Sequence, residues 1–322
     1  MFHRFAQPCL IATLVATAAI SHAQQDNFPS RPITLVAPFP AGSVTDSVTR
    51  IVGQAMQEVL GQTVVVDNRA GAQGTVGAAY VARAKPDGYT LLMASSGMFV
   101  AKSFYKSLTY DPTEAFQPVS GIGSTSMMFM VAQDSPYKSM ADLTREAKSG
   151  KPVTVAFGSP SGQLALALYS AAAQVSPVPV SYRGIPQALT DLGGGHVNVA
   201  VVDIGSGVAQ MNSGKMRPIA ISARGRSTAA PEVPTMEEVF RGGGNSLETL
   251  IAIMAPAGTP KSVVDKLDNA VRTALSRTAV KARFQALTTS VVPLSADELT
   301  KRIRDDNPKW EALIKKAGIE QQ

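Results

Sequence analysis

The chain has 322 residues and a net charge of +6, with 30 Lys and Arg against 24 Asp and Glu. This length is enough for two domains with their own cores. The basic residues are scattered, and the tightest group, Arg224 and Arg226, is too small for a polyanion groove, so we expect no nucleic-acid partner. The mild positive potential would assist the capture of acidic solutes.

Residues 1–23 have the pattern of a signal peptide. His3 and Arg4 give a short basic start, Cys9 to Ile20 form an apolar run, and Ser21-His22-Ala23 supplies small residues for cleavage. The run is shorter than the roughly 20 residues that cross a bilayer. We therefore expect cleavage near Ala23 and a periplasmic location; a signal anchor is the alternative.

Cleavage would remove Cys9, the only Cys, and two of the three His. His196 remains, in a glycine turn where an exposed surface residue is expected. Zinc sites built from His and Cys need several such ligands, and a nucleophile–His–acid triad would have to use this one residue. We expect no metal, no cofactor, no disulfide and no enzymatic activity.

The first elements in chain order are a strand, a tight turn and an amphipathic helix. Thr34 to Phe39 reads as a buried strand, and Pro40 and Gly42 break the pattern. The helix then runs from Val44 to Leu60 with one apolar stripe, and Gly61 stops it. The free N–H groups at its start suit an anion, above all a carboxylate.

Strands and helices alternate through the rest of the chain, which predicts an α/β fold. The expected strands are Val64 to Val66, Tyr89 to Ala94, Met127 to Ala132, Val153 to Phe157, Val178 to Tyr182, Val197 to Val202, Arg217 to Ser222 and Leu247 to Ala255. The expected helices are Gly74 to Ala84, Met140 to Lys148, Gln163 to Ala173, Pro186 to Leu192, Gly207 to Asn212, Ser262 to Leu275 and a C-terminal helix that bears Trp310. Ser295 and Glu298 have the spacing of a capping box at the start of that last helix.

Ligands of open α/β sheets collect where strands end and helices begin. Four loops meet this rule. Their candidate ligand-binding residues are Ala41, Gly42, Ser43, Val44, Thr45 and Asp46 in the first loop, Ser95 and Ser96 in the second, Gly158, Ser159 and Ser161 in the third, and Asp203 in the fourth.

Each candidate also has a purely structural interpretation. Thr45 and Asp46 could cap their own helix, the Ser-Gly loops could be plain turns, and Asp203 could cap the segment that follows it. The negative charge of Asp46 would oppose an anion, so Asp46 would orient the loop or face a ligand hydroxyl or amine. Asp203 could accept from a ligand hydroxyl or ammonium.

Several segments in series resemble the extracytoplasmic solute receptors of the tripartite tricarboxylate transporter family, often called Bug receptors. They are RPITLVAPFPAGSVTD (31–46), VVVDNRAGAQGTVGA (64–78), PDGYTLLM (86–93), YKSLTYDP (105–112), GGHVNVAVVD (194–203), PEVPTMEE (231–238), APAGTP (255–260) and KWEALIKKAGI (309–319). The resemblance covers essentially the whole chain after the signal peptide.

The resemblance implies a two-lobed periplasmic-binding-protein architecture of the type II, Venus-flytrap kind, with a ligand cleft between the lobes. The first lobe would comprise residues 24–126 and 249–322, and the second residues 127–248. It further implies a monomer that captures a small organic anion by lobe closure. Delivery would be to the membrane components of a tripartite transporter, or the signal would pass to a sensor kinase.

The chain departs from the family pattern near the expected cleft. Val44 stands in a loop that commonly has two adjacent glycines, Gln163 replaces a common His, Ala167 a frequent acid, and Ile204 a common Asn. Val44 and Ile204 suggest a less polar pocket, suited to an aromatic or hydrophobic carboxylate.

Two rival interpretations stay open at this point. An exported hydrolase-like enzyme on the same fold would have Asp46 and Asp203 as its acid–base candidates. It would lack a G-x-S-x-G serine. A receptor without a solute would instead serve a protein partner.

Overall fold

The computed structural model describes residues 28–241 and 243–321, so the expected signal peptide lies outside the described residues. The fold starts with β1 (Ile33–Ala37) and α2 (Val44–Leu60). Helix α2 has the predicted bounds: its apolar stripe is buried and Gly61 ends it in the left-handed conformation, with φ of 64°. No helix in the described part of the chain has the length and apolar character needed to cross a bilayer.

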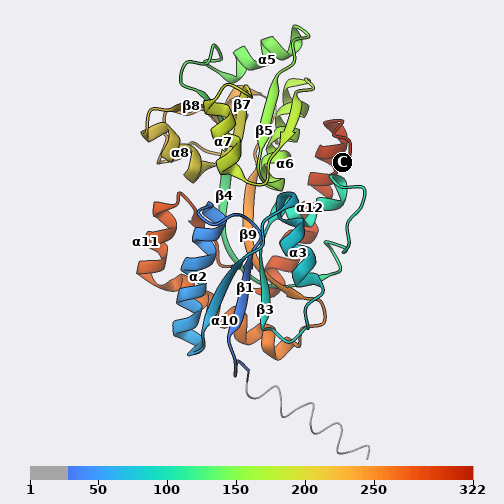
Figure 1. Ribbon diagram of the computed structural model, residues 1–322, viewed down its shortest axis with the longest axis vertical. Coiled ribbons are helices and arrows are strands. Elements are labelled where there is room, and N and C mark those ends of the chain that lie inside the picture. Colours follow the sequence, from blue (N-terminus) through green and yellow to red (C-terminus); the bar gives the residue numbers. More distant parts are fainter. Residues whose placement is uncertain (1–27, 242, 322) are drawn as a thin grey trace, which may run out of the picture.

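The first lobe is built on a sheet in the order β2-β1-β3-β9-β4, with β10 beside β4. Strands β1, β2 and β3 are parallel, and β9 is antiparallel to β3 and β4. Helices lie around this sheet in the lower half of Figure 1. Its further elements are β2 (Val64–Asn68), η1 (Ala72–Gly74), α3 (Thr75–Ala82), β3 (Thr90–Ser95), α4 (Ser96–Phe99), η2 (Ala101–Ser103), β4 (Phe116–Ala132), β9 (Glu248–Pro256), α10 (Lys261–Ser276), α11 (Thr278–Ala286) and β10 (Ser290–Val291).

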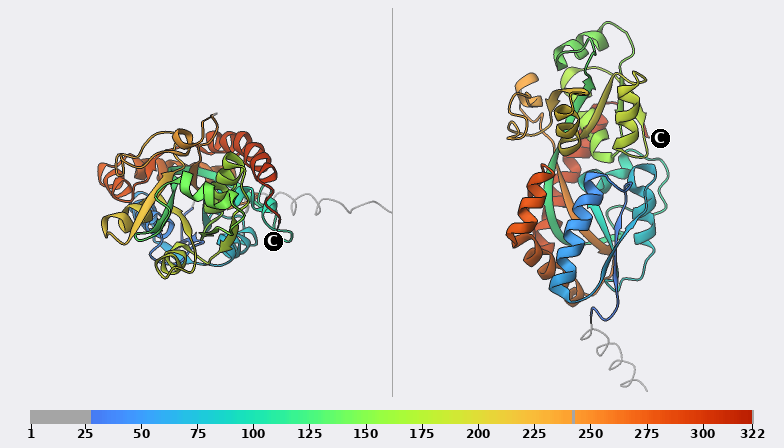
Figure 2. Two further views of the ribbon diagram at one scale, coloured as in Figure 1. Left: turned by 90° about the horizontal axis from the view of Figure 1, so that it is seen from above. Right: turned by 60° about the vertical axis from the view of Figure 1, so that its left-hand side comes forward.

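The second lobe has a sheet in which β4 pairs with β8 on one side and β7 on the other, followed by β5 and β6. Strands β5, β6 and β7 are parallel. The elements are α5 (Met140–Lys148), β5 (Thr154–Phe157), α6 (Pro160–Ala173), β6 (Val178–Ser181), α7 (Ile185–Gly193), β7 (Val199–Asp203), α8 (Ile204–Asn212), β8 (Met216–Ile221) and α9 (Met236–Val239). Figure 2 shows the two lobes stacked along the long axis of the molecule.

Strand β4 joins the two lobes. Its residues from Phe116 to Ser126 pair with β9, and those from Met127 onward pair with β7 and β8. The expected strand from Met127 to Ala132 is therefore only the last third of a much longer strand. The first part of β4 is not predicted from the sequence because Gly121 and Gly123 have weak strand propensity. Both glycines lie beside register shifts in the pairing with β9.

Helix α12 (Ala296–Lys316) starts with the predicted capping box, because Ser295 and Glu298 exchange both bonds. Its end packs on the second lobe: Ile314 is buried in the core around α6, and Trp310 and Leu313 pack against the same core. In Figure 1 this helix passes along the side of the junction between the lobes.

Several helix starts differ from the expectation. Helix α6 begins at Pro160 rather than Gln163, because Ser159 caps it and proline is favoured in a first helical turn. Helix α8 begins directly after Asp203, which caps it. Ser96, expected in a loop, starts the short helix α4. Helices α9 and α11 have no counterpart among the predicted elements.

Ser222, which follows β8, holds together the two chain segments that pass between the lobes. It is fully buried, and its hydroxyl accepts from Met127 N (2.9 Å) and donates to Leu247 O (2.7 Å). Its backbone bonds to the same two residues, with Ser222 N donating to Met127 O and Leu247 N donating to Ser222 O. Ser222 thus fixes β4 against the start of β9.

We expect Ser222→Ala to lower the free energy of unfolding by about 2–3 kcal/mol, since it leaves two buried backbone groups without a partner. Urea denaturation would show a lower midpoint with an unchanged slope. Ser213→Ala is the matched control, because the Ser213 hydroxyl is exposed and bonds only to Gln210 O of its own helix. An unchanged midpoint in Ser222→Ala would mean that these bonds do not stabilise the junction.

Candidate ligand-binding site

A small cavity of about 50 Å³ lies between the lobes, at the ends of strands from both sheets. Eight of the predicted site residues line it: Ser43, Val44, Thr45, Ser95, Gly158, Ser159, Ser161 and Asp203. The volume would hold a few waters, at roughly 10–15 Å³ each. The lobes are thus close together around the cavity.

The cavity lies between the lobes because the continuous sheet path curls. The lining loops follow β1, β3, β7, β5 and β6, and the path from β1 to β6 runs through β9 and β4. Its two ends meet: a Cβ placed on Gly184, after β6, would lie 2.9 Å from Pro40 Cγ, after β1. Beside this contact, Gln73 Nε2 of the first lobe donates to Ser181 Oγ of the second at 2.9 Å.

The floor of the cavity comes from the interiors of two strands. Thr125 and Met127 of β4 are two residues apart and face the same side, as do Thr249 and Ile251 of β9. Thr125 and Thr249 are direct partners in the ladder. Sequence reasoning from loops missed these four and also the remaining lining residues, which are Phe39, Pro40, Gly184 and Ile185.

Four hydroxyl groups in the cavity are buried without a hydrogen-bond partner among the described residues. They belong to Ser95, Thr125, Ser161 and Thr249. Ser161 and Thr249 are 3% and 2% exposed. Buried polar groups in native proteins are nearly always satisfied by protein or ordered water. Four such groups around one cavity indicate a place for a polar solute or for waters.

Two long helices begin at the cavity, one from each lobe. In α2 the Ser43 hydroxyl caps Asp46 N (3.2 Å), and in α6 the Ser159 hydroxyl caps Gly162 N (3.1 Å). The N–H groups of Val44, Thr45 and Ser161 belong to first turns and have no acceptor within their helices. Together with the helix dipoles, these N–H groups of both lobes favour a negatively charged group in the cavity.

Four predicted site residues do not line the cavity. Ala41 and Gly42 are exposed on the turn before α2. Ser96 lies within the first lobe, where its hydroxyl accepts from Leu250 N at 2.8 Å. Asp46 is turned into the protein below the loop. These residues shape the site from outside the cavity.

Asp46 holds the first loop in place. Its carboxylate accepts from Gly42 N (3.0 Å), Asn68 Nδ2 (2.9 Å) and Arg50 Nε (3.1 Å). Burial alone would raise the pKa of Asp46, but the hydrogen bonds from Arg50, Gly42 and Asn68 outweigh it and lower the pKa below its ordinary value. Its charge is thus neutralised locally, which removes the repulsion of an anion.

Asp203 has both roles that the sequence suggested, since it caps α8 and lines the cavity. Oδ1 accepts from Ser206 N (2.8 Å) and Oδ2 from Ser206 Oγ (3.0 Å). Burial raises the pKa of this carboxyl, against the hydrogen bonds from Ser206. It is the one charged side chain among the described residues that line the cavity.

The other singled-out residues lie elsewhere. Gln163 and Ala167 are buried in α6 outside the cavity, and Ile204 faces a neighbouring groove. His196 is exposed in its turn, as expected. The described residues contain no group of three or more His, Cys, Asp or Glu placed to hold a metal ion.

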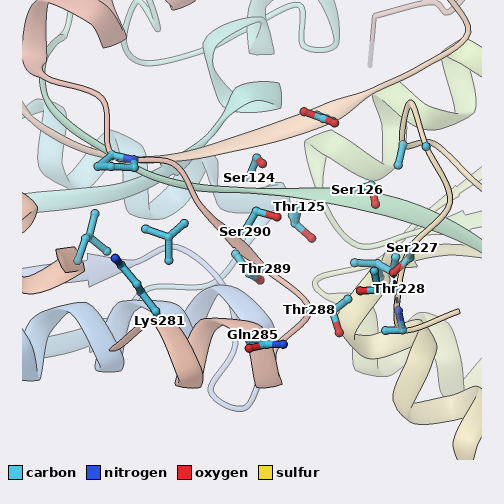
Figure 3. Close-up of a pocket in the computed structure, with 18 of the residues that line it drawn as sticks. Ser124, Thr125, Ser126, Ser227, Thr228, Lys281, Gln285, Thr288, Thr289 and Ser290 are labelled. Atoms are coloured by element: carbon cyan, nitrogen blue, oxygen red, sulfur yellow. Dashed lines mark hydrogen bonds between the residues drawn. The ribbon is translucent and has the colours of Figure 1, made fainter. Parts of the chain in front are cut away.

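A larger groove of about 1590 Å³ runs along the side of the junction that carries α10 and α11. Figure 3 shows Ser124, Ser126, Thr288 and Ser290 around it, with Lys281 and Gln285 on α11. Thr288 has a φ of 53°, which is unusual for a β-branched residue. Both signs of charge line this groove, including Arg272 and Asp268, and the groove has no set of helix starts comparable with that of the cavity.

Comparison with known proteins identifies the family of this chain. Residues 48–319 match the family described as "Tripartite tricarboxylate transporter family receptor". The chain belongs to this family. Protein BugT of Bordetella pertussis, strain Tohama I, is 32% identical over 317 residues, which cover 96% of each chain.

Solved receptor structures share the fold. The periplasmic binding protein BugD superposes with a TM-score of 0.84 at 32% identity, covering 92% of this chain and all of that one. Rpa4515 of R. palustris with adipate gives 0.85 at 27% identity, covering 92% and 100%. MatC of Rhodopseudomonas palustris with bound malate gives 0.83 at 29% identity, covering 89% and 100%. The expected α/β, two-lobed binding-protein fold and the expected family are both confirmed.

Proposed function

We propose that this protein is a periplasmic solute receptor that captures a small organic carboxylate in the cavity between its lobes. One observation carries the proposal: four buried hydroxyls without a partner among the described residues converge with the starts of α2 and α6 on one cavity between the lobes. The relatives solved with adipate and malate support a carboxylate as the ligand.

In the proposed mechanism the carboxylate first binds to the amides of Val44 and Thr45 at the start of α2. The second lobe then closes, and Ser161 adds its amide and hydroxyl. Each hydrogen bond to a charged group contributes roughly 1.5–3 kcal/mol. Three or four of them are comparable with the roughly 8 kcal/mol of a micromolar complex, before ordering and desolvation costs.

The proposed location, oligomeric state and partner of this protein are those expected for a member of its family. We propose export with cleavage near Ala23, action as a monomer, and delivery to the membrane components of a tripartite transporter, with a sensor kinase as the alternative recipient. We propose binding without turnover, because Asp46 lies outside the cavity and Asp203, the other candidate for acid–base chemistry, serves as the N-cap of α8.

We further propose residues 24–126 and 249–322 as the first lobe and 127–248 as the second. The change of pairing partners of β4 after Ser126 and the start of β9 at Glu248 support these boundaries. The end of α12 belongs to the first lobe in sequence but stabilises the second, since Ile314 is buried there.

The test is thermal unfolding of the protein purified from the periplasm, against a panel of mono- and dicarboxylates. A ligand at 100 times its Kd stabilises by about 2.7 kcal/mol. For a domain of 150–250 residues this raises Tm by roughly 5–11 °C. A panel without any shift would contradict a carboxylate receptor, and the N-terminal mass of the purified protein would test cleavage near Ala23.

We expect Ser161→Ala to weaken binding of the carboxylate found in this way by about tenfold, because it removes one hydrogen bond to a charged group. The unliganded variant should be as stable as the wild type or more so, since the deleted hydroxyl has no partner among the described residues. Isothermal titration measures the affinity. Ser170→Ala, in the same helix but outside the cavity, is the control. Equal affinity in Ser161→Ala and Ser170→Ala would exclude Ser161 from the site.

A further inference from the structure

Asp203 is a buried carboxylate in the cavity, and no cation among the described residues pairs with it. It is 8% exposed, and no Lys, Arg or His lies among the described residues that line the cavity. Its hydrogen bonds come only from the start of its own helix. A buried charge of this kind is costly unless it is paired.

Capping α8 does not explain why this residue is an acid. An N-cap needs one side-chain oxygen, and Asn or Ser fulfils the role as well as Asp does. A carboxylate has about four lone-pair sites, and Ser206 occupies two of them. The remaining acceptor capacity is available to a donor in the cavity.

The position of Asp203 separates it from the α2 start. Asp203 follows β7, and its ladder partner is Met127 on the floor of the cavity. The amides of Val44 and Thr45 follow β1, on the other side of β3, β9 and β4 in the sheet order. Both line the same cavity, so a solute whose carboxylate lies at α2 can present its other end to Asp203.

The space between these two ends combines apolar and hydroxyl groups. Val44, Ile185 and Ile251 offer apolar contact for a carbon skeleton. The Thr125 and Thr249 hydroxyls have no partner among the described residues and can bond a polar substituent. A second carboxylate placed there would meet the Asp203 charge, and no basic side chain among the described lining residues would offset it.

We propose that Asp203 determines specificity, selecting solutes that carry one carboxylate and, at the other end, a hydrogen-bond-donating group, either an ammonium or a hydroxyl. A second carboxylate is selected against. This inference rests on the proposed function, since it assumes that the first carboxylate binds in the same cavity.

The test is isothermal titration of the full exported protein with matched ω-substituted carboxylates. For each chain length from three to six carbons, the ω-amino, ω-hydroxy, ω-methyl and ω-carboxylate forms are compared. We expect the amino or hydroxy form to bind at least tenfold more tightly than the methyl form, and the dicarboxylate to bind least. The preference between amino and hydroxy identifies the donor.

Asp203→Asn keeps a helix cap but removes the charge. We expect at least a tenfold loss for the ω-amino form, a smaller loss for the ω-hydroxy form and a gain for the dicarboxylate. Asp191→Asn is the matched control, because Asp191 lies outside the cavity and accepts from the Tyr182 hydroxyl. If Asp203→Asn does not fold, the wild-type order of affinities alone decides.

The outcomes separate this inference from the proposed function. Tightest binding of a dicarboxylate by the wild type, or an order unchanged by Asp203→Asn, would overturn the role of Asp203 and leave a carboxylate receptor intact. Absence of binding by every carboxylate in the series and in the wider panel would overturn the proposed function and this inference together.

Discussion

Gly184→Ala is expected to weaken solute affinity by roughly 5- to 150-fold while leaving the unliganded protein as stable as the wild type. The added Cβ would lie 2.9 Å from Pro40 Cγ and 3.0 Å from Pro40 Cδ, across the junction between the lobes. Gly184 has an extended backbone, with φ of −175°, so alanine is not strained there. Overpacking of this kind costs about 1–3 kcal/mol, and each 1.4 kcal/mol is tenfold in affinity.

The added methyl group raises the free energy of the closed state, because Pro40 and Gly184 belong to different lobes. In an open receptor the two residues separate and the extra methyl group is free, so the penalty acts only on the closed, liganded state. Isothermal titration would measure the affinity and thermal unfolding the stability without ligand.

Gly193→Ala is the control for this variant. It lies in the same lobe at the end of α7, where a Cβ would be 3.6 Å from Met216 Cε, an ordinary contact. If Gly184→Ala bound the solute as tightly as Gly193→Ala, the liganded receptor would not bring Pro40 against Gly184. The enclosed arrangement would then not be the liganded one.

How far the sequence alone predicts this fold depends on the range of the interactions involved. Helix α2 was predicted with its bounds because its stripe and its stop at Gly61 are local signals. All four predicted loops reach the cavity, two with all of their candidate residues and two with half of them, because the carboxyl ends of parallel strands meet at one edge of a sheet. The α/β class follows from the same local patterns.

The floor of the cavity could not be predicted in this way. Thr125 and Thr249 become neighbours only because β4 and β9 pair across a long sequence separation. Each threonine alone is a common strand residue on either face of a sheet. The path of the curled sheet, which brings Pro40 to Gly184, likewise depends on the complete strand order.

Side-chain direction also separated residues that the sequence grouped together. Ser95 and Ser96 are adjacent, yet Ser95 faces the cavity and Ser96 bonds to Leu250 N. Thr45 and Asp46 divide in the same way, because the first turn of α2 turns Asp46 toward Arg50 and Asn68. A loop can thus be located from the sequence before its lining residues are known.

We expect Asp46→Ala to lower the free energy of unfolding by about 1–3 kcal/mol at neutral pH, and to weaken solute binding as well. The Asp46 side chain is 5% exposed whereas Arg50 is 51% exposed, so the main loss is that of a buried acceptor rather than that of the ion pair. Gly42 N and Asn68 Nδ2 lose their acceptor, and the loop that carries Ser43 and Thr45 is released.

Asp67→Ala is the matched control for this variant. Asp67 also pairs with an arginine, Arg69, but both side chains are more than one third exposed. Surface pairs contribute about 0–1 kcal/mol, so this substitution should change little. Urea denaturation of both variants would measure the difference.

The pH dependence of the difference gives an independent check. The pKa of Asp46 is lowered in the folded state, so its charge stabilises the protein above the unfolded value of about 3.9. This stabilisation is lost as the pH falls through the folded pKa. The gap in unfolding free energy between wild type and Asp46→Ala should therefore narrow between pH 5 and pH 3.

A gap that stayed constant over this range would show that Asp46 acts through packing and neutral hydrogen bonds rather than through its charge. The loop at the start of α2 would then be held without electrostatic help.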